Sequence, residues 1–234
     1  MKILSIDTSS EACSASLNLD GELITKFEIA PQKHSSLILT MCDDLLAQCD
    51  IKLNQLDAVA FGQGPGSFTG LRIAAGVTQG IAFGADLPVI SVSTLAALAQ
   101  QIKTHTNDTK IIAAIDARMQ EVYWCIYSVD ENGLVIPEMN EEISSPDNVT
   151  FENKGIKSDS VFGIGTGLFE FSDELKSKPF APLVSNIFDN RLTSAEEIGV
   201  LAANKLRNGE VLSAGQAIPV YLRNDVAKKS SKQK

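Results

Sequence analysis

Apolar positions in the first half of the chain form short runs, followed by a longer stretch with helical spacing. Lys2–Asp7 is an apolar run that ends in a carboxylate, and the runs at 13–19 and 22–29 are separated by Asp20-Gly21. An Asp-Gly pair between two strand-like segments is a strong signal for a β-hairpin. The pattern therefore predicts three strands, followed by a helix over residues 35–49.

The second half of the chain repeats this order of elements. Lys110–Asp116 again ends in Ile-Asp, a strand-like run at 121–129 follows it, and Asn132-Gly133 marks a second hairpin turn. Such a repeat predicts an α/β fold of two ribonuclease-H-like lobes facing a cleft, the architecture of actin, hexokinase and the sugar kinases. We expect mixed sheets flanked by helices, with lobes over 1–105 and 106–225 and a basic disordered tail over 226–234.

The helix predicted over 35–49 has more apolar surface than one core-facing stripe requires. At about 100° per residue, its apolar side chains cover an arc of roughly 200°. They are Leu37, Ile38, Leu39, Met41, Cys42, Leu45, Leu46 and Cys49. The surplus predicts that a second element or a partner protein covers one flank. We choose the edge with Leu37 and Met41 as that flank, because Asp44 and Gln48 border it as a polar rim.

A glycine-rich turn, Gly62-Gln63-Gly64-Pro65-Gly66, follows an apolar strand at 56–61 and precedes a second helix that Ser67 or Thr69 can cap. The turn has neither the lysine of a Walker A loop nor the third glycine of a dinucleotide fingerprint. An architectural turn is therefore favoured over a phosphate cradle, although a helix N-terminus still attracts anions weakly.

The helix after this turn contains glycines at four-residue spacing. Gly76, Gly80 and Gly84 form a ridge without side chains on one face, and Arg72 and Gln79 are its only strongly polar side chains. A ridge of this kind lets another backbone approach closely. The sequence therefore predicts a buried helix, buried in part by another chain.

Charge and cysteine content narrow the class of protein. The net charge of −9 argues against a general nucleic-acid binder, whose affinity depends on neutralising phosphates. Four lysines follow Asp225, most simply as a solvated end, and their contact with RNA is left open. The four cysteines have no Cys-x-x-Cys pairing, which predicts free thiols in a reducing compartment. With no signal peptide or membrane span expected, the protein is predicted to be soluble and cytoplasmic.

In two-lobed folds of this kind, the first strand of each lobe leads into a loop that wraps nucleotide phosphates, and glycine lets the backbone approach them. The first loop here reads Asp7-Thr8-Ser9-Ser10, without glycine, and the second reads Asp116-Ala117-Arg118-Met119, with two bulky side chains. We predict a vestigial nucleotide cleft at Asp7, Thr8, Ser9, Asp116 and Arg118. Asp7 as a water-mediated magnesium ligand is the less favoured alternative to a strand-capping acid.

Three glycines later in the chain have two equally supported interpretations. Gly163, Gly165 and Gly167 lead from a short strand into a short helix. They could accept an adenosine as part of the vestigial cleft, or they could simply turn the chain.

Other catalytic chemistries have little support. His34 and His105 are the only histidines, and neither belongs to a His-x-x-x-His or His-Glu-x-x-His metal motif. The nucleophile motif Gly-x-Ser-x-Gly is also missing. We therefore predict no metal site and no catalytic residues.

Several motifs together resemble the bacterial TsaB (YeaZ) family. They are Ile6-Asp7-Thr8-Ser9, the run from Gly64 to Arg72, Ser91-Val92-Ser93-Thr94-Leu95, Ala114-Ile115-Asp116-Ala117-Arg118, Glu121-Val122-Tyr123 and Pro219-Val220-Tyr221-Leu222-Arg223-Asn224. The resemblance extends from end to end and is loose only between Pro137 and Ser160. Gly-Pro-Gly-Ser-Phe-Thr-Gly together with Asp-Ala-Arg is a specific combination.

The resemblance implies a role in adding a threonylcarbamoyl group to N6 of the adenosine beside the anticodon, in tRNAs that read codons beginning with A. In that family the paralogue TsaD is the catalyst, and this chain is a non-catalytic partner that pairs with TsaD through N-terminal helices, recruits the ATPase TsaE and forms a homodimer when alone. Contact with tRNA would be indirect, and no cofactor is implied beyond weak nucleotide binding at a subunit junction. The alternative is an ATP-binding hydrolase or phosphotransferase that uses Asp7 and Asp116. The candidate partner-binding residues are His34, Leu37, Ile38, Met41, Leu45, Arg72, Gly76 and Gly80.

Overall fold

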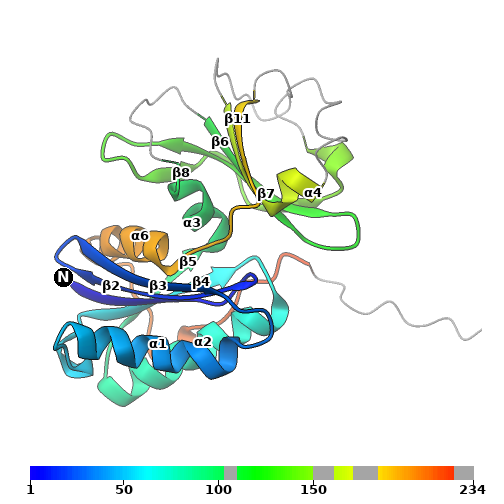
Figure 1. The fold of residues 1–234 in the computed structure, drawn as a ribbon. Coiled ribbons are helices and arrows are strands. Elements are labelled where there is room, and N and C mark those ends of the chain that lie inside the picture. Colours follow the sequence, from blue (N-terminus) through cyan, green and yellow to red (C-terminus); the bar gives the residue numbers. More distant parts are fainter. Residues whose placement is uncertain (103–109, 150–160, 171–183, 224–234) are drawn as a thin grey trace, which may run out of the picture.

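The computed structural model describes residues 1–102, 110–149, 161–170 and 184–223. It contains two mixed sheets, one in each lobe, with helices below the first sheet and between the two (Figure 1). The strand order is β3-β2-β1-β4-β5 in the first sheet and β11-β10-β6-β7-β8 in the second, where β9 also pairs with β7. The predicted α/β fold with two mixed sheets is confirmed.

The first sheet follows the alternation read from the sequence. Its strands are β1 (Lys2–Asp7), β2 (Ala12–Leu19), β3 (Glu22–Ile29), β4 (Ala58–Gly64) and β5 (Val89–Ser93). Strand β2 pairs antiparallel with both β1 and β3, and the predicted hairpin joins β2 to β3. Strand β4 pairs in parallel with β1, and β5 with β4. Helices α1 (His34–Gln48) and α2 (Phe68–Ala85) cover its outer face (Figure 1). The 3-10 turns η1 (Leu53–Gln55) and η5 (Ala214–Gln216) lie against the same lobe.

The second sheet repeats the strand plan of the first, with two short strands, β8 and β9, after the hairpin turn. Its strands are β6 (Lys110–Asp116), β7 (Val122–Val129), β8 (Val135–Pro137), β9 (Glu142–Ser144), β10 (Val161–Gly165) and β11 (Val184–Asp189). Helix α4 (Thr166–Glu170) follows β10, and the 3-10 turn η2 (Pro146–Asn148) follows β9. Two strands had not been predicted: β11, and β9, which lies inside the stretch 137–160 where the motif match is loose.

Helices α3 (Thr94–Gln100) and α6 (Ala195–Arg207) form a layer between the two sheets (Figure 1). Their apolar side chains belong to one core with residues of both sheets, including Ile3, Ile90 and Ile111. Helix α6 contacts β1, β2, β4 and β5 of the first sheet. The predicted second lobe over 106–225 therefore needs correction, because α6 and the segment after it pack against the first lobe. The boundary at 105/106 and the tail over 226–234 lie outside the described residues.

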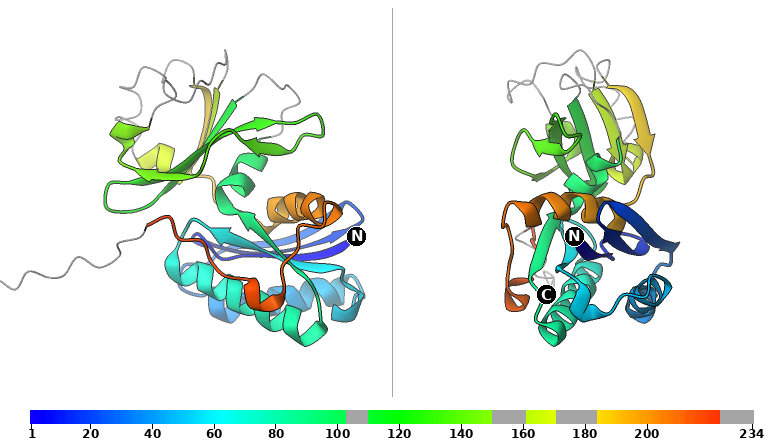
Figure 2. Two further views of the ribbon diagram at one scale, coloured as in Figure 1. Left: turned by 180° about the vertical axis from the view of Figure 1, so that it is seen from behind. Right: turned by 90° about the vertical axis from the view of Figure 1, so that its left-hand side faces the viewer.

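The helix ends agree with the capping signals in the sequence. Ser67 caps α2 by accepting a hydrogen bond from the Gly70 amide, and Ser194 caps α6 through the Glu196 amide. Residues 217–222 join neither sheet but cross the outside of the first lobe (Figure 2). Within the described ranges, no helix is long and apolar enough to cross a bilayer.

Candidate functional site

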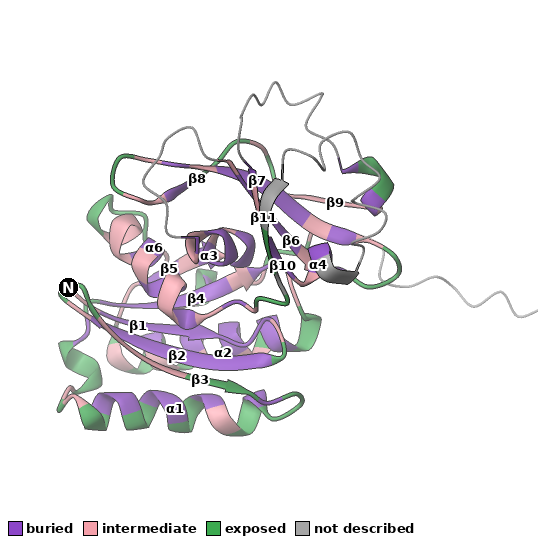
Figure 3. Cartoon of the chain, turned by 45° about the horizontal axis from the view of Figure 1, so that its top comes forward, coloured by how far each residue is buried: buried purple, intermediate pink, exposed green. Residues whose placement is uncertain are grey.

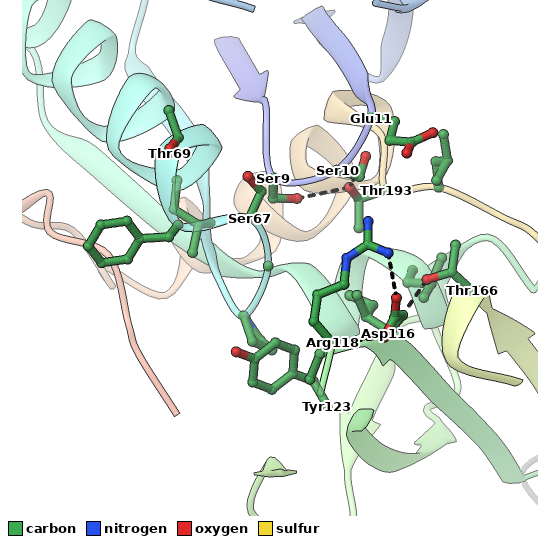
Figure 4. Close-up of a pocket in the computed structure, with 18 of the residues that line it drawn as sticks. Ser9, Ser10, Glu11, Ser67, Thr69, Asp116, Arg118, Tyr123, Thr166 and Thr193 are labelled. Atoms are coloured by element: carbon green, nitrogen blue, oxygen red, sulfur yellow. Dashed lines mark hydrogen bonds and ion pairs between the residues drawn. The ribbon is translucent and has the colours of Figure 1, made fainter. Parts of the chain in front are cut away.

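A cleft of about 890 Å³ separates the two lobes, on the side where β1 and β6 end (Figure 4). Its walls come from the loop after β1, the glycine-rich turn before α2, the turn between β6 and β7, the segment before α6 and the last described residues, 220–223. The carboxyl ends of the two equivalent strands thus face one cleft, as the duplicated pattern predicts.

Asp7 lies behind the cleft wall rather than in it. Its side chain is fully buried and accepts hydrogen bonds from the Thr193 hydroxyl, the Ser9 hydroxyl and the Ser9 amide. Burial raises the pKa of Asp7 above its ordinary value, although these hydrogen bonds lower it in part. Asp7 therefore connects the first loop to Thr193 just before α6, which supports the strand-capping interpretation.

The loop after β1 is closed by the chain's own glycine-rich turn. The Thr8 hydroxyl donates to the Gly70 carbonyl at 2.7 Å, and the Ser67 amide donates to the Ser9 carbonyl at 2.8 Å. A Cβ atom on Gly70 would overlap the Thr8 carbonyl oxygen, and one on Gly66 would lie 2.6 Å from the Ser9 carbonyl oxygen. These glycines are therefore needed for the close approach of two backbone segments, which supports the architectural interpretation of the turn.

The turn between β6 and β7 has a different construction. Arg118, Met119 and Gln120 have φ values of 61°, 57° and 60°, three consecutive non-glycine residues in the left-handed region. Each costs about 1 kcal/mol relative to an ordinary conformation. The Arg118 side chain is 80% exposed and pairs with Asp116 at 3.0 Å, and Met119 is 75% exposed beside it. In Figure 4 Arg118 extends from this turn toward Ser10 and Thr193 on the other lobe.

The predicted nucleotide-site residues are only partly brought together. Ser9, Asp116 and Arg118 line the cleft, whereas Asp7, Thr8 and the three later glycines do not. Cβ atoms on Gly165 and Gly167 would press against the backbone of β6 around Ala114 and Ile115. The geometry of these two glycines thus matches the chain-turning interpretation rather than an adenosine pocket.

The candidate partner-binding residues of α1 are mostly buried within this chain. Buried positions recur along α1 (Figure 3). Ile38, Met41 and Leu45 face the core between α1 and the first sheet, and Leu37 is half-buried beside them. His34 is buried at the start of α1 and lines the cleft instead. Met41 is only 8% exposed, whereas Leu39 is 50% exposed. The choice of the Leu37–Met41 edge as the open flank is therefore wrong for Met41. Leu39, at the opposite end of the arc, is exposed, although Leu46 at the same end is buried. The helical pattern gave the width of the apolar arc but not which part of it α2 and β2 cover.

The glycine ridge of α2 is exposed in this chain. A Cβ atom added to Gly76, Gly80 or Gly84 would have no contact within 4 Å beyond its own stretch of the helix. Phe83, beside the ridge, is 85% exposed. Within this chain, helix α2 packs one face on β4 and leaves the ridge open, so burial of the ridge by another chain stays a prediction.

Arg72 lies one helical turn before Gly76, and we call Arg72, Gly76, Gly80, Phe83 and Gly84 together the exposed row of α2. Its guanidinium lies 3.6 Å above the Phe68 ring centroid and 5.8 Å from that of Tyr221, an arrangement typical of cation–π contact. Among the described residues Arg72 makes no ion pair or hydrogen bond, so its in-plane N–H groups remain available to a partner.

Sequence reasoning missed several residues of the cleft. Thr193 bonds to Asp7 and reaches Ser9 and Ser10, a role that its position just before a helix does not indicate. Residues 220–223 also form part of the wall. The Pro-Val-Tyr-Leu-Arg run at 219–223 was the available signal, but a local pattern cannot show that it returns to the glycine-rich turn.

In the part of the chain that the structure describes, no side chains are arranged for metal binding or for catalysis by a thiol. This part contains no cluster of three or more His, Cys, Asp or Glu side chains placed to hold a metal ion. Burial raises the pKa of Cys13 to about 11, and of Cys42 and Cys125 to about 12. At neutral pH these three thiols are therefore protonated and poor nucleophiles.

Two lobes with equivalent strand ends at one cleft define a protein of the actin-like, ribonuclease-H-like class, here with its first loop closed by the chain itself. Within that class, the chain belongs to the TsaB (YeaZ) family. Residues 26–231 match the family model described as "TsaD: tRNA N6-adenosine threonylcarbamoyltransferase".

Relatives cover nearly the whole chain. The tRNA threonylcarbamoyladenosine biosynthesis protein TsaB of Escherichia coli is 41% identical over 97% of this chain and 96% of its own length. The Haemophilus influenzae protein of the same name is 38% identical over 97% of this chain and 95% of its own. The solved structure of YeaZ from Pseudomonas aeruginosa is 38% identical, with a TM-score of 0.85 over 94% of this chain and 99% of that one.

Proposed function

We propose that this protein acts in the cytoplasm in the biosynthesis of threonylcarbamoyladenosine in tRNA, as a non-catalytic subunit that supports the transferase TsaD. The names of its relatives support the pathway, and the match to the TsaD model supports a paralogous relationship with the catalyst. Its partners would be TsaD and the ATPase TsaE, with a homodimer when it is alone and indirect contact with tRNA.

One observation carries the non-catalytic assignment. The loop after β1 is held by Gly66 of the glycine-rich turn and by Gly70 in the first turn of α2, so its backbone is not open to a phosphate. The second loop carries Arg118 and Met119 instead of glycine. We therefore propose no cofactor for the cleft, and leave weak nucleotide binding to a junction between subunits.

This assignment predicts that the isolated protein neither hydrolyses ATP nor modifies tRNA. The measurement is steady-state phosphate release, with Asp7→Ala as the comparison variant and circular dichroism to show that it remains folded. Turnover by the wild type that disappears in folded Asp7→Ala would instead establish the hydrolase or phosphotransferase alternative.

The partner surface that the structure favours is the exposed row on α2 with Leu39 of α1. Gly76, Gly80 and Gly84 offer a groove in which a helix of the partner can approach closely. Phe83 adds apolar area beside it, and Leu39 is an exposed apolar side chain on the neighbouring helix α1. Of the predicted partner-binding residues, Arg72, Gly76 and Gly80 lie on this surface. Met41 and its buried neighbours would act by supporting α1 from beneath.

Gly80→Leu tests the groove directly. The added side chain enters open space in the free protein, so the melting temperature should stay close to that of the wild type, while binding to TsaD weakens at least about tenfold because the interface is overpacked. Isothermal titration measures the affinity. Arg207→Leu, which adds an apolar side chain at the exposed end of α6, is the control and should bind normally. Full binding by Gly80→Leu would place the interface on another face.

A pair of aspartate variants separates the two edges of α1. Leu39→Asp should weaken TsaD binding and leave the fold intact, because Leu39 is half-exposed. Met41→Asp should instead unfold the isolated protein early, because it buries a carboxylate without a partner. The reverse result in thermal melts and titrations would restore the original choice of flank.

A further inference from the structure

The last described residues, 217–223, connect the two lobes along the outside of the molecule, and we call them the strap (Figure 2). Its first part is fixed to the first lobe. The Ala217 carbonyl accepts a hydrogen bond from Gln79 of α2 at 2.9 Å, and the Val220 amide donates to the Gln63 carbonyl at 2.8 Å. A Cβ atom on Gly64 would lie 2.6 Å from the Val220 carbonyl oxygen, so the glycine-rich turn has room for the strap only because Gly64 lacks a side chain.

The end of the strap is fixed to the second lobe by one side chain. The Arg223 guanidinium donates to the Ala117 carbonyl at 2.9 Å and pairs with the Glu121 carboxylate at 2.7 Å. It also lies 2.9 Å from the Met119 sulfur and 3.4 Å from the Arg118 carbonyl oxygen. All of these contacts are made to the turn between β6 and β7.

This turn requires outside support. Its three consecutive left-handed residues are unfavourable on their own, and such conformations persist where surrounding contacts determine them. Arg223 contacts the backbone carbonyls at the start of the turn and the carboxylate at its end. Together with the turn's own hydrogen bonds, it therefore holds the turn, and with it Arg118, over the cleft.

Between its two ends the strap lies on the exposed face of α2. The Tyr221 ring is 5.3 Å from the Phe68 ring, and Arg72 stacks on Phe68 and faces Tyr221. Phe68 and Tyr221 are both partly exposed, so a protein that docks on the α2 row also meets the strap.

We propose that the strap couples the exposed face of α2 to the turn between β6 and β7, so that a protein docked on α2 sets the position of that turn and the opening of the cleft. The coupling rests on the proposed function, in which TsaD docks on α2. It makes the inter-lobe cleft a regulated part of the subunit, and Arg223 a positioning residue.

Hydrogen exchange of the full chain tests the coupling in two steps. The Ala117 and Glu121 amides close the turn through hydrogen bonds to the Glu121 and Arg118 carbonyls, so their exchange reports on it. In the free protein, Arg223→Ala should speed exchange of both amides at least about fivefold. Arg207→Ala removes the same charge from an exposed position without a hydrogen bond or ion pair to a described residue, and should leave exchange unchanged. Arg223→Lys keeps the ion pair with Glu121 but not the fork of carbonyl contacts, and should fall between the two.

The second step adds TsaD. In the wild type, bound TsaD should slow exchange of the Ala117 and Glu121 amides at least about threefold, whereas Arg223→Ala should bind TsaD without this protection. Unchanged exchange in free Arg223→Ala, or equal protection by TsaD in both proteins, would overturn the coupling. If the wild type does not bind TsaD at all, the proposed function and the coupling both fail, while the free-protein step still decides whether Arg223 holds the turn.

Discussion

The loops that follow β1 and β6 occupy equivalent places in the two lobes, and they are held by opposite means. The first is buried beneath a neighbouring segment whose glycines allow backbone to touch backbone. The second projects into solvent, with three left-handed residues and the side chain of Arg223 from the strap. The comparison teaches that one duplicated fold can fix the loop after its first strand in two ways, by covering the loop with backbone or by holding it with side chains.

The largest effect that this comparison predicts is at Gly70. Gly70→Ala should lower the free energy of unfolding by about 3 kcal/mol or more, because its Cβ atom would overlap the Thr8 carbonyl oxygen and push the first loop away. Gly76→Ala on the same helix is the matched control and should raise stability by about 0.5–1 kcal/mol, since its Cβ atom meets open space. Urea titration measures both variants. A mild Gly70→Ala would mean that the first loop is not closed in solution.

A pH series on Asp7→Asn gives an intermediate effect. Burial raises the folded-state pKa of Asp7, so the stability linked to its protonation is fully present below the unfolded value of 3.8 and is lost as pH rises through the folded pKa. Wild-type stability relative to Asp7→Asn should therefore fall as pH rises from 3 to 7, by about 1.4 kcal/mol for each unit of pKa elevation. Denaturation at a series of pH values measures the difference. A difference that is flat, or that grows with pH, would contradict the buried environment assigned to Asp7.

The smallest predicted effect lies in the second loop. Gln120→Gly should raise the free energy of unfolding by about 0.5 kcal/mol, because glycine adopts a φ near 60° without the strain that glutamine carries there. Gln48→Gly, at the exposed end of α1, should instead lower stability by about 0.5–1 kcal/mol. Chemical denaturation distinguishes the two signs. Equal losses in both variants would show that the left-handed turn is not strained.

Local patterns predicted the parts of the fold that local chemistry determines. Asp20-Gly21 and Asn132-Gly133 located both hairpins, and the acids at the ends of β1 and β6 revealed the duplication. Strand β11 was missed because it contains Ser185 and Asn186 and is a strand only through its parallel pairing with β10. That pairing depends on distant residues, which periodicity does not show.

The candidate site, like the fold, could be predicted only where local sequence determines it. The glycine-rich turn was correctly interpreted as architecture, because the residues that a phosphate cradle requires are missing from it. The burial of Met41 and the return of Arg223 to the second lobe both depend on packing between segments far apart in sequence. Amphipathic spacing shows that a helix has apolar surface, but the neighbouring elements decide which part of that surface stays open.

The return of α6 to the first sheet has a consequence for synthesis on the ribosome. Ile198 and Ala202 share a core with Ile3 and Ala58, so strands made at the start of translation lack part of their cover until almost the whole chain has emerged. The first lobe therefore cannot complete its core as an independent early unit, although chains commonly fold from the N-terminal domain onward. Nascent chains that end before residue 195 should remain sensitive to protease across β1–β5, and resistance should appear in a single late step.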